Sequence, residues 1–248
     1  MRVASFNIRN GRAFDGWNSW PLRRRSTLAA IRSLDADVIG LQEAYPSQRQ
    51  WLAFRLRTHD VVGEFRDGGR RGEGTPLLLR RATVEHTDAW TRWFGGLRGV
   101  RLPGASFPRI ATSAVVTERA TGGRARVTNL HLDEHSATNR RASVEELLTW
   151  LDEDDDLAHV VLGDFNATVE DPIFELLAGH GLRHAVPRGS GGTAHGFTGR
   201  SSGRRIDHIL VSSSIQVRGA SVVTTTGRRL PSDHWPVVAE ITVPGPSL

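Results

Sequence analysis

Cysteine is absent from this 248-residue sequence, and its absence excludes several kinds of chemistry. Without thiols the chain can form no disulfide, no cysteine nucleophile, and no cysteine-ligated zinc or iron–sulfur site. Any metal chemistry must therefore use the side chains of Asp, Glu, Asn and His.

Lysine is absent as well, so every basic side chain other than histidine is an arginine. The formal net charge is +5, and the planar guanidinium group is well suited to binding phosphate. A polyanionic substrate is one explanation of this composition. A GC-rich genome that replaces lysine throughout is the simpler explanation, because scattered charge is mostly solvated surface.

Long apolar runs and linker-like stretches are also missing. No run approaches the roughly 20 apolar residues that cross a bilayer, and the first residues form a strand-like pattern instead of a signal peptide. No segment rich in Pro, Gly or Ser divides the chain. We therefore expect a single domain over residues 1–248 that is monomeric, has no transmembrane segment, and is cytoplasmic or already processed.

Strand-like and helix-like segments alternate from one end of the sequence to the other. Pro21 and Pro172 stand at plausible first-turn positions of two helices. Because helices lie between many of the strands, the pattern indicates a layered α/β domain. The expected helices are 22–34, 47–57, 136–151 and 172–177, and the expected strands are 2–8, 37–42, 76–79, 111–117, 126–132, 159–162, 205–212, 215–225 and 234–243.

Polar side chains follow several of these strands, at the end where an open α/β sheet binds its ligands. The first strand delivers Asn7, the second delivers Glu43, a third carries His131 and Asp133 at its end, and a fourth runs into Asp164 and Asn166. A carboxylate at the end of a buried strand is costly unless a cation or hydrogen bonds compensate it. Each residue alone is compatible with a cap or a turn, but together they indicate a reaction centre.

Two later segments add an acid and an Asp-His pair. Asp207 lies inside the apolar segment RIDHIL, and Asp233 and His234 precede the last strand in SDHWPV. A carboxylate that accepts a hydrogen bond from an imidazole fixes its tautomer and favours the charged ring. Asp207 and His234 are therefore a candidate orienting pair directed at phosphate. A turn-capping Asp beside a structural His is the alternative.

The ordered motifs SFNIR, LQE, NLHLD, GDFNA, RIDHIL and SDHWPV resemble the endonuclease/exonuclease/phosphatase superfamily. This superfamily includes DNase I, exonuclease III-type abasic endonucleases, sphingomyelinases and inositol phosphatases. The match extends from Asn7 to His234, in the order and approximate spacing of the family. The resemblance implies a DNase I-like four-layer sandwich, in which two packed mixed β-sheets are flanked by helices. It also implies divalent-metal-dependent hydrolysis of phosphoester bonds by in-line attack of an activated water.

The same resemblance implies a set of metal ligands. Glu43 is the principal carboxylate for Mg²⁺ or Mn²⁺, with Asn7 beside it, in an oxygen-rich shell that suits these cations. Asp233 is a further acid on the metal side. The chain departs from the abasic endonucleases two residues after Asn7, where they have an additional metal acid and this sequence has Arg9. A second metal at that place is therefore doubtful.

The resemblance implies catalytic roles as well. Asp164 is the base or water-orienting residue, Asn166 donates to a phosphate oxygen, and Asp207 is the partner of His234. His131 occupies the second catalytic position, which is His in the DNase I branch and Tyr in the abasic endonucleases. At this position the chain is therefore more similar to DNase I.

Two supporting residues follow from the same comparison. Glu73, just before the strand-like TPLLL, stands where the DNase I branch has a Glu that pairs with the catalytic His, here His131. Arg109, in FPRIATSAV, corresponds to an Arg that grips phosphate. An exposed loop charge is the alternative for Glu73.

The substrate class remains open at this level. The arginine clusters are short and interrupted, whereas nucleic-acid binding normally needs several phosphate contacts along one face. Trp90, Trp93 and Phe94 either line a substrate cleft or pack in the core. We expect a small phosphoester or a nucleotide-type substrate, with DNA cleavage of the DNase I type as the alternative. A non-catalytic Arg-rich nucleic-acid-binding protein is the alternative of another class, with salt-dependent DNA affinity that survives a chelator.

A zinc hydrolase is the remaining rival. His131, Asp133 and His135 in HLDEH resemble half of a dinuclear zinc motif. The remaining histidine-rich ligands do not follow in usable order, so the motif alone does not support a zinc site.

Overall fold

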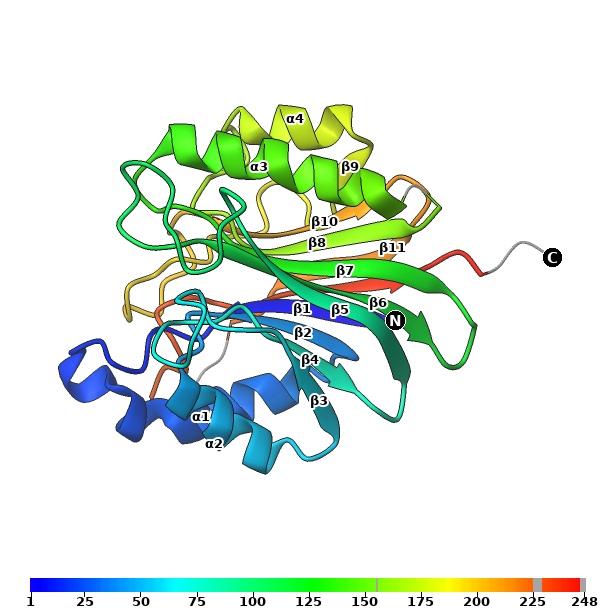
Figure 1. Cartoon of the computed structure of the whole chain (residues 1–248). Helices are drawn as coiled ribbons and strands as arrows, with labels where there is room; N and C mark the ends of the chain where they lie inside the picture. The colour runs from blue at the N-terminus through cyan, green and yellow to red at the C-terminus, as the bar shows by residue number, and fades with distance from the viewer. Residues whose placement is uncertain (155, 225–228, 246–248) are drawn as a thin grey trace.

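The computed structural model of the chain describes residues 1–154, 156–224 and 229–245. Two six-stranded sheets pack face to face, and helices lie on their outer faces (Figure 1). The predicted DNase I-like four-layer sandwich is therefore confirmed. None of the helices in the described ranges is long and apolar enough to cross a membrane.

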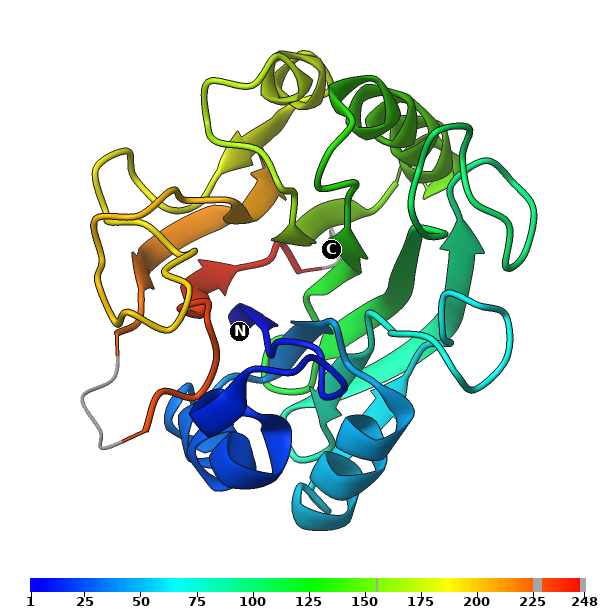
Figure 2. The ribbon, with the colours of Figure 1, turned by 90° about the vertical axis from the view of Figure 1, so that its left-hand side faces the viewer.

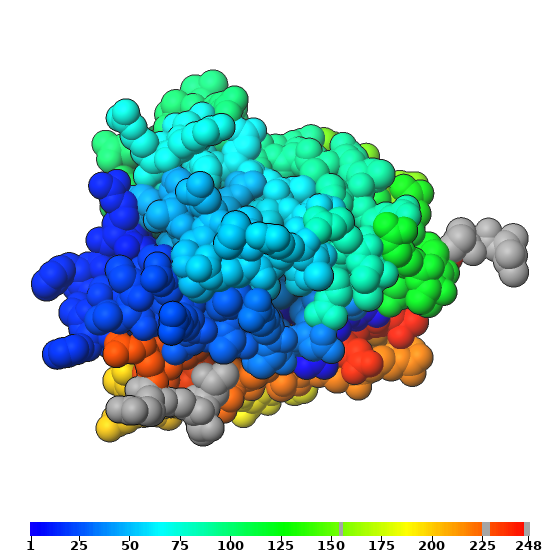
Figure 3. Space-filling view, turned by 90° about the horizontal axis from the view of Figure 1, so that it is seen from below, coloured from blue at the N-terminus to red at the C-terminus, as the bar shows by residue number. Residues whose placement is uncertain are grey.

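The first sheet has the strand order β11-β12-β1-β2-β4-β3. Its strands are β1 (Arg2–Asn7), β2 (Val38–Gln42), β3 (His59–Val62), β4 (Leu77–Arg80), β11 (Gln216–Val222) and β12 (Val237–Thr242). The helices α1 (Trp20–Ser33) and α2 (Pro46–Arg55) cover its outer face, which is seen from below in the space-filling view (Figures 1 and 3).

The second sheet has the strand order β5-β6-β7-β8-β10-β9. Its strands are β5 (Val84–Trp93), β6 (Ile110–Glu118), β7 (Arg124–His131), β8 (Ala158–Asp164), β9 (Leu182–His184) and β10 (Asp207–Ser212). Its outer face is covered by α3 (Ala137–Leu151) and α4 (Ile173–Gly179) (Figure 1).

Aliphatic side chains fill the space between the two sheets, because the central strands turn alternate residues toward each other. Val3, Val38 and Val160 belong to this buried layer. A hydrogen bond between polar side chains also connects the two sheets: Gln42 Nε2 donates to Asn129 Oδ1 at 2.6 Å. A Cβ atom on Gly40 would lie 2.2 Å from a methyl carbon of Leu162, so glycine permits this close approach of the sheets.

Three strands were not expected from the sequence: β3, β5 and β9. Each lies at the edge of its sheet, where one side of the strand has no partner and the burial pattern is weak. β5 contains Trp90 and Trp93, and the core alternative for these aromatic residues is correct. Trp93 is buried, and Trp90 packs edge-on against Trp150 with ring centroids 5.8 Å apart.

Each expected strand differs from the observed one by one to three residues at one end or both, and three of these differences are the most relevant. The strand expected at 205–212 begins at Asp207, and the strand expected at 234–243 begins at Val237, so His234 lies in the loop before it. The strand expected at 215–225 is β11, which ends at Val222, and residue 225 lies outside the described residues.

Two parallel strand pairs position the candidate site. β1 runs parallel to β2, with Asn7 opposite Gln42, and β7 runs parallel to β8, with His131 opposite Asp164. Because the carboxyl ends of parallel strands lie at the same edge, each pair delivers its polar residues to one place. Figure 2 looks toward this edge of the sandwich. β10 runs antiparallel to β8, so its first residue, Asp207, also stands opposite Asp164.

Candidate active site

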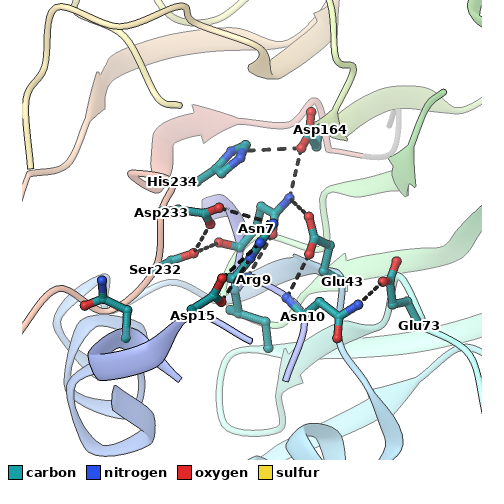
Figure 4. A network of polar contacts seen from close by, with 12 residues as sticks. Asn7, Arg9, Asn10, Asp15, Glu43, Glu73, Asp164, Ser232, Asp233 and His234 are labelled. Atoms are coloured by element: carbon teal, nitrogen blue, oxygen red, sulfur yellow. Dashed lines mark hydrogen bonds and ion pairs between the residues drawn. The ribbon is translucent and has the colours of Figure 1, made fainter. Parts of the chain in front are cut away.

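Asp164 is the residue at which the strand ends meet. It is the last residue of β8 and is only 1% exposed. Its Oδ2 atom lies 2.9 Å from Asn7 Nδ2, 3.7 Å from His131 Nε2 and 3.9 Å from His234 Nδ1. Figure 4 shows Asp164 with Asn7 and His234 around it. Residues from both sheets therefore contact the carboxylate of Asp164.

The backbone on either side of Asp164 explains why the GDFNA motif is needed. Gly163 has a φ of 151°, and a Cβ atom there would lie 2.1 Å from the Leu130 carbonyl oxygen, so only glycine fits. Asn166 adopts a φ of 51°. Its backbone N–H donates to Asp164 Oδ1 at 2.9 Å, and its Nδ2 donates to the Leu132 carbonyl at 3.1 Å. This turn holds the Asp164 carboxylate in place.

Glu43 is joined to Asp164 through Asn7. Asn7 Nδ2 donates to Glu43 Oε1 at 3.0 Å as well as to Asp164, and the backbone N–H of Asn10 donates to Glu43 Oε2 at 2.7 Å (Figure 4). Glu43 itself has a φ of 58°, a conformation that is unfavourable for residues other than glycine. Such strain is often found at functional sites, where the surrounding contacts maintain it.

His234 and Asp207 form the predicted pair. His234 Nδ1 lies 2.8 Å from Asp207 Oδ2, and both side chains are buried. Burial alone would lower the pKa of His234, but the charge of Asp207 and its hydrogen bond raise that pKa well above its ordinary value. The ring is therefore held in its charged form, next to Asp164.

His131, in contrast to His234, is held in its neutral form. Burial, together with the nearby guanidinium of Arg109, lowers the pKa of His131 well below its ordinary value. Burial and the charge of Asp207 raise the pKa of Asp164. A neutral imidazole and a basic carboxylate thus stand 3.7 Å apart. Groups with pKa values shifted in this way are common where protons are transferred in catalysis.

A pocket of about 200 Å³ lies beside this cluster, and Glu43, Glu73, Arg109 and His131 line it, whereas Asp164 and His234 do not. The Nε atom of Arg109 is buried without a hydrogen-bond partner among the described residues. A buried guanidinium with a free N–H beside a pocket is well placed to receive an anion.

The model of the Endonuclease/Exonuclease/phosphatase family matches residues 4–234 of the chain. The chain belongs to this family. Solved structures of family members from Bacteroides thetaiotaomicron and Bacteroides vulgatus are similar, with 26% and 29% identity and a TM-score of 0.91 for each. The first comparison covers 97% of both chains and the second covers 98% of both. A mannosyl-6-phosphatase from Bacteroides thetaiotaomicron VPI-5482 has 26% identity and a TM-score of 0.88, with 98% of this chain and 99% of that chain covered. Comparison with curated proteins gave no match.

This endonuclease/exonuclease/phosphatase-family protein is accordingly a phosphoester hydrolase, and one group of its residues can hold a metal ion. Ligand atoms of Asp164, Asp207 and His234 lie within 4.8 Å of one another. No other group of three such residues was found in the described ranges. In this group, however, His234 Nδ1 is used in the hydrogen bond to Asp207.

One expected pairing in this family member is wrong. Glu73 was expected to pair with His131, but its carboxylate pairs with Arg66 at 2.6 Å and accepts a hydrogen bond from Asn10 Nδ2 at 2.5 Å. Burial and the neighbouring charge of Glu43 raise the pKa of Glu73. Glu73 lines the same pocket as His131, but its contacts are with Arg66 and Asn10.

Arg9 gives Asp233 a cationic partner of its own. Arg9 Nη1 lies 3.6 Å from Asp233 Oδ2, and Arg9 Nη2 lies 3.0 Å from Asp15 Oδ1 (Figure 4). Asp233 also accepts a hydrogen bond from Ser232 Oγ at 3.1 Å. The arginine thus occupies the region for which the sequence already made a second metal doubtful.

The zinc alternative is not supported by the geometry of the HLDEH segment. Asp133 Oδ1 accepts hydrogen bonds from the backbone N–H groups of His135 and Ser136, so it caps a turn. The His135 side chain is exposed and contacts Glu134. These side chains do not converge with His131 on one point.

Five pocket residues of this family member were not assigned from the sequence. They are Asn10, Ala13, Arg66, Phe107 and Glu134. Asn10 directly follows the SFNIR motif, which was a usable signal. Arg66 and Phe107 lie in long irregular segments, where no apolar pattern shows which way a side chain points.

Proposed function

We propose that this protein hydrolyses phosphoester bonds of small molecules in a reaction that requires Mg²⁺ or Mn²⁺. The observation that carries the proposal is the position of Asp164, whose carboxylate lies next to Asn7, His131 and His234 and is joined through Asn7 to Glu43. Two residues of this group, Glu43 and His131, line the pocket. The volume of about 200 Å³ suits a phosphoryl group with a compact leaving group.

The residues present fit a hard divalent cation. The acids are oxygen donors, which Mg²⁺ and Mn²⁺ prefer. Surplus negative charge is evident, because the pKa of Asp164 is raised and Asp207 Oδ1 is buried without a hydrogen-bond partner among the described residues. Glu43 would hold the cation. When bound, the cation supplies positive charge that polarises a phosphoryl oxygen and offsets the charge on the leaving oxygen.

The other two expected metal ligands, Asn7 and Asp233, are less available to a cation than Glu43 is. Asn7 Oδ1 accepts from the backbone N–H of Arg9 at 2.9 Å, while Asn7 Nδ2 donates to both carboxylates, so its part is to hold Glu43 in place. Asp233 already has Arg9 as a partner. We therefore assign the cation chiefly to Glu43.

The chain's own groups carry the remaining chemistry. Asp164 accepts a proton from the attacking water, because its raised pKa makes the carboxylate a better base. Arg109, His131 and Asn166 donate to the phosphoryl oxygens as the bond to the leaving oxygen breaks. Charged His234, held by Asp207, stabilises the negative charge of the transition state.

Sugar phosphates are the first substrates to test. The likeness to a mannosyl-6-phosphatase at 26% identity over nearly the whole chain supports a compact phosphomonoester. The experiment compares p-nitrophenyl phosphate, bis-p-nitrophenyl phosphate, mannose 6-phosphate and plasmid DNA, with Mg²⁺, with Mn²⁺ and with excess chelator. We expect activity only with a metal, and higher kcat/KM on the monoesters than on DNA.

Two variants test the assignment of roles. We expect Asp164→Asn to lower kcat about a hundredfold or more, as the loss of a group that acts in the transition state usually does. Glu43→Gln should raise the Mg²⁺ concentration needed for half-maximal activity. Glu145→Gln, on the exposed side of α3, serves as the control. Full activity in excess chelator, or in Asp164→Asn, would contradict the mechanism.

A further inference from the structure

The mouth of the catalytic pocket carries an aromatic ring that the proposed reaction does not use. Phe107 lines the pocket and remains 46% exposed. Its ring lies over the Arg66 guanidinium, with 4.1 Å between Arg66 Cζ and the ring centroid. Arg66 is in turn paired with Glu73. One face of the ring is therefore held by a buried ion pair, and part of the ring stays open to solvent.

An acidic residue, Glu134, lies at the same opening of the pocket. Glu134 also lines the pocket, and 45% of its side chain is exposed. Its only ion-pair partner within the described residues is the exposed His135, at 3.1 Å. The charge of Glu134 is thus weakly compensated, whereas the buried Arg66 in the same lining is paired with Glu73. The buried Arg109 keeps an N–H without a partner among the described residues and can receive a phosphoryl group, while Glu134 adds negative charge at an exposed part of the lining.

We propose that Phe107 and Glu134 determine which leaving group the pocket accepts, and that they favour an uncharged ring bearing hydroxyl groups, such as a sugar. This inference rests on the proposed hydrolysis of phosphoesters. The C–H face of a sugar ring packs on an aromatic face, and a carboxylate accepts hydrogen bonds from hydroxyl groups. The same carboxylate repels a second phosphate or a nucleic-acid backbone.

The first test separates a contact with the ring from a general effect on the site. Glucose 6-phosphate has a sugar ring and methyl phosphate has none, so the ratio of their kcat/KM values reports the ring contact. We expect Phe107→Ala to lower this ratio about tenfold, which corresponds to the loss of one aromatic packing contact. Phe107→Tyr should restore the ratio. Phe54→Ala is the matched control, because Phe54 is an exposed phenylalanine on α2 that also contacts arginines.

The second test concerns charge. Glucose 1,6-bisphosphate differs from glucose 6-phosphate by one further phosphate, which the carboxylate of Glu134 would repel. We expect Glu134→Gln to raise kcat/KM for the bisphosphate relative to the monophosphate by about fivefold at low salt, and by less at high salt. Glu145→Gln is the control, because Glu145 is an exposed acid with a single ion-pair partner, Arg141.

The outcomes distinguish this inference from the proposed function. If Phe107→Ala lowers both substrates equally, the ring acts only by supporting Arg66, and the inference is overturned while the hydrolase stands. An unchanged bisphosphate ratio in Glu134→Gln overturns the part assigned to the acid. Wild-type protein that cleaves a single-stranded oligonucleotide as well as it cleaves glucose 6-phosphate overturns the whole inference. If no phosphoester is hydrolysed with any metal, the proposed function fails, and the inference fails with it.

Discussion

Replacing Arg23 on α1 by methionine should weaken both the fold and the reaction centre. Arg23 is 0% exposed, and no carboxylate among the described residues lies within ion-pair distance of it. Its guanidinium donates to four backbone carbonyls, at 2.9 Å for Asn18, 2.7 Å for Ile8, 2.7 Å for Arg9 and 3.0 Å for Pro231. It therefore connects the loop after β1 to the segment that leads to His234, the candidate catalytic histidine.

The size of the effect follows from these contacts. Each hydrogen bond from a charged donor contributes about 1.5–3 kcal/mol, and methionine removes these four together with a longer one to Thr27 Oγ1 at 3.4 Å. The variant also relieves the cost of burying a cation, which is several kcal/mol and which lowers the pKa of Arg23 to about 10. The carbonyls left without a donor remain buried. We therefore expect Arg23→Met to lower the free energy of unfolding by about 3–5 kcal/mol.

Urea unfolding followed by circular dichroism measures this difference. For a chain of this length, 3–5 kcal/mol corresponds to a decrease in Tm of about 6–20 °C. Arg25→Met, at an exposed position of the same helix, is the control and should change stability by less than about 0.5 kcal/mol. Arg23→Lys should lie between the two, because an ammonium group reaches fewer carbonyls. Stability of Arg23→Met within about 1 kcal/mol of the wild type would refute the reasoning.

Two further predictions concern histidines. Asp207→Asn should lower kcat about a hundredfold or more, because His234 loses the charge that raises its pKa; unchanged kcat in steady-state assays would contradict this role. Burial lowers the pKa of His208 to about 3, and its ring Nε2 lies 2.9 Å from the Ala167 carbonyl. The unfolded chain binds this proton below about pH 6.5 and the folded chain does not, so acid removes stability. Between pH 7 and 5 His208 should account for about 2 kcal/mol of the loss in urea unfolding, and His208→Gln should lose less.

Local patterns in the sequence were enough to predict the interior of the fold. The central strands are buried on both sides, so their apolar runs are continuous, and β1, β2, β7 and β8 were all expected. The strands that escaped prediction, β3, β5 and β9, lie at sheet edges. There one side of the strand is solvated, and the alternation of apolar and polar residues is weak.

The reaction centre also has a part that the sequence predicted and a part that it did not. Asn7, Glu43, His131 and Asp164 could be named from the sequence, because each follows or ends an apolar strand and the chain direction places it at the ligand-binding edge. Which side chains these residues contact could not be predicted from the sequence, because the tertiary structure decides it. Glu73 contacts Arg66 instead of the expected His131, because Arg66 and Glu73 face each other within the loop between β3 and β4, where the Arg66 N–H also donates to the Glu73 carbonyl at 2.8 Å. This loop is irregular, so no apolar periodicity in the sequence predicted the contact.

The candidate catalytic residues were therefore predicted from short motifs, each of which sets a residue type and a local backbone conformation. Which charge stands next to which, and hence the raised pKa of His234 and the lowered pKa of His131, was decided by contacts between residues far apart in the chain. Electrostatic interactions depend on distance and burial, and no local pattern encodes either quantity.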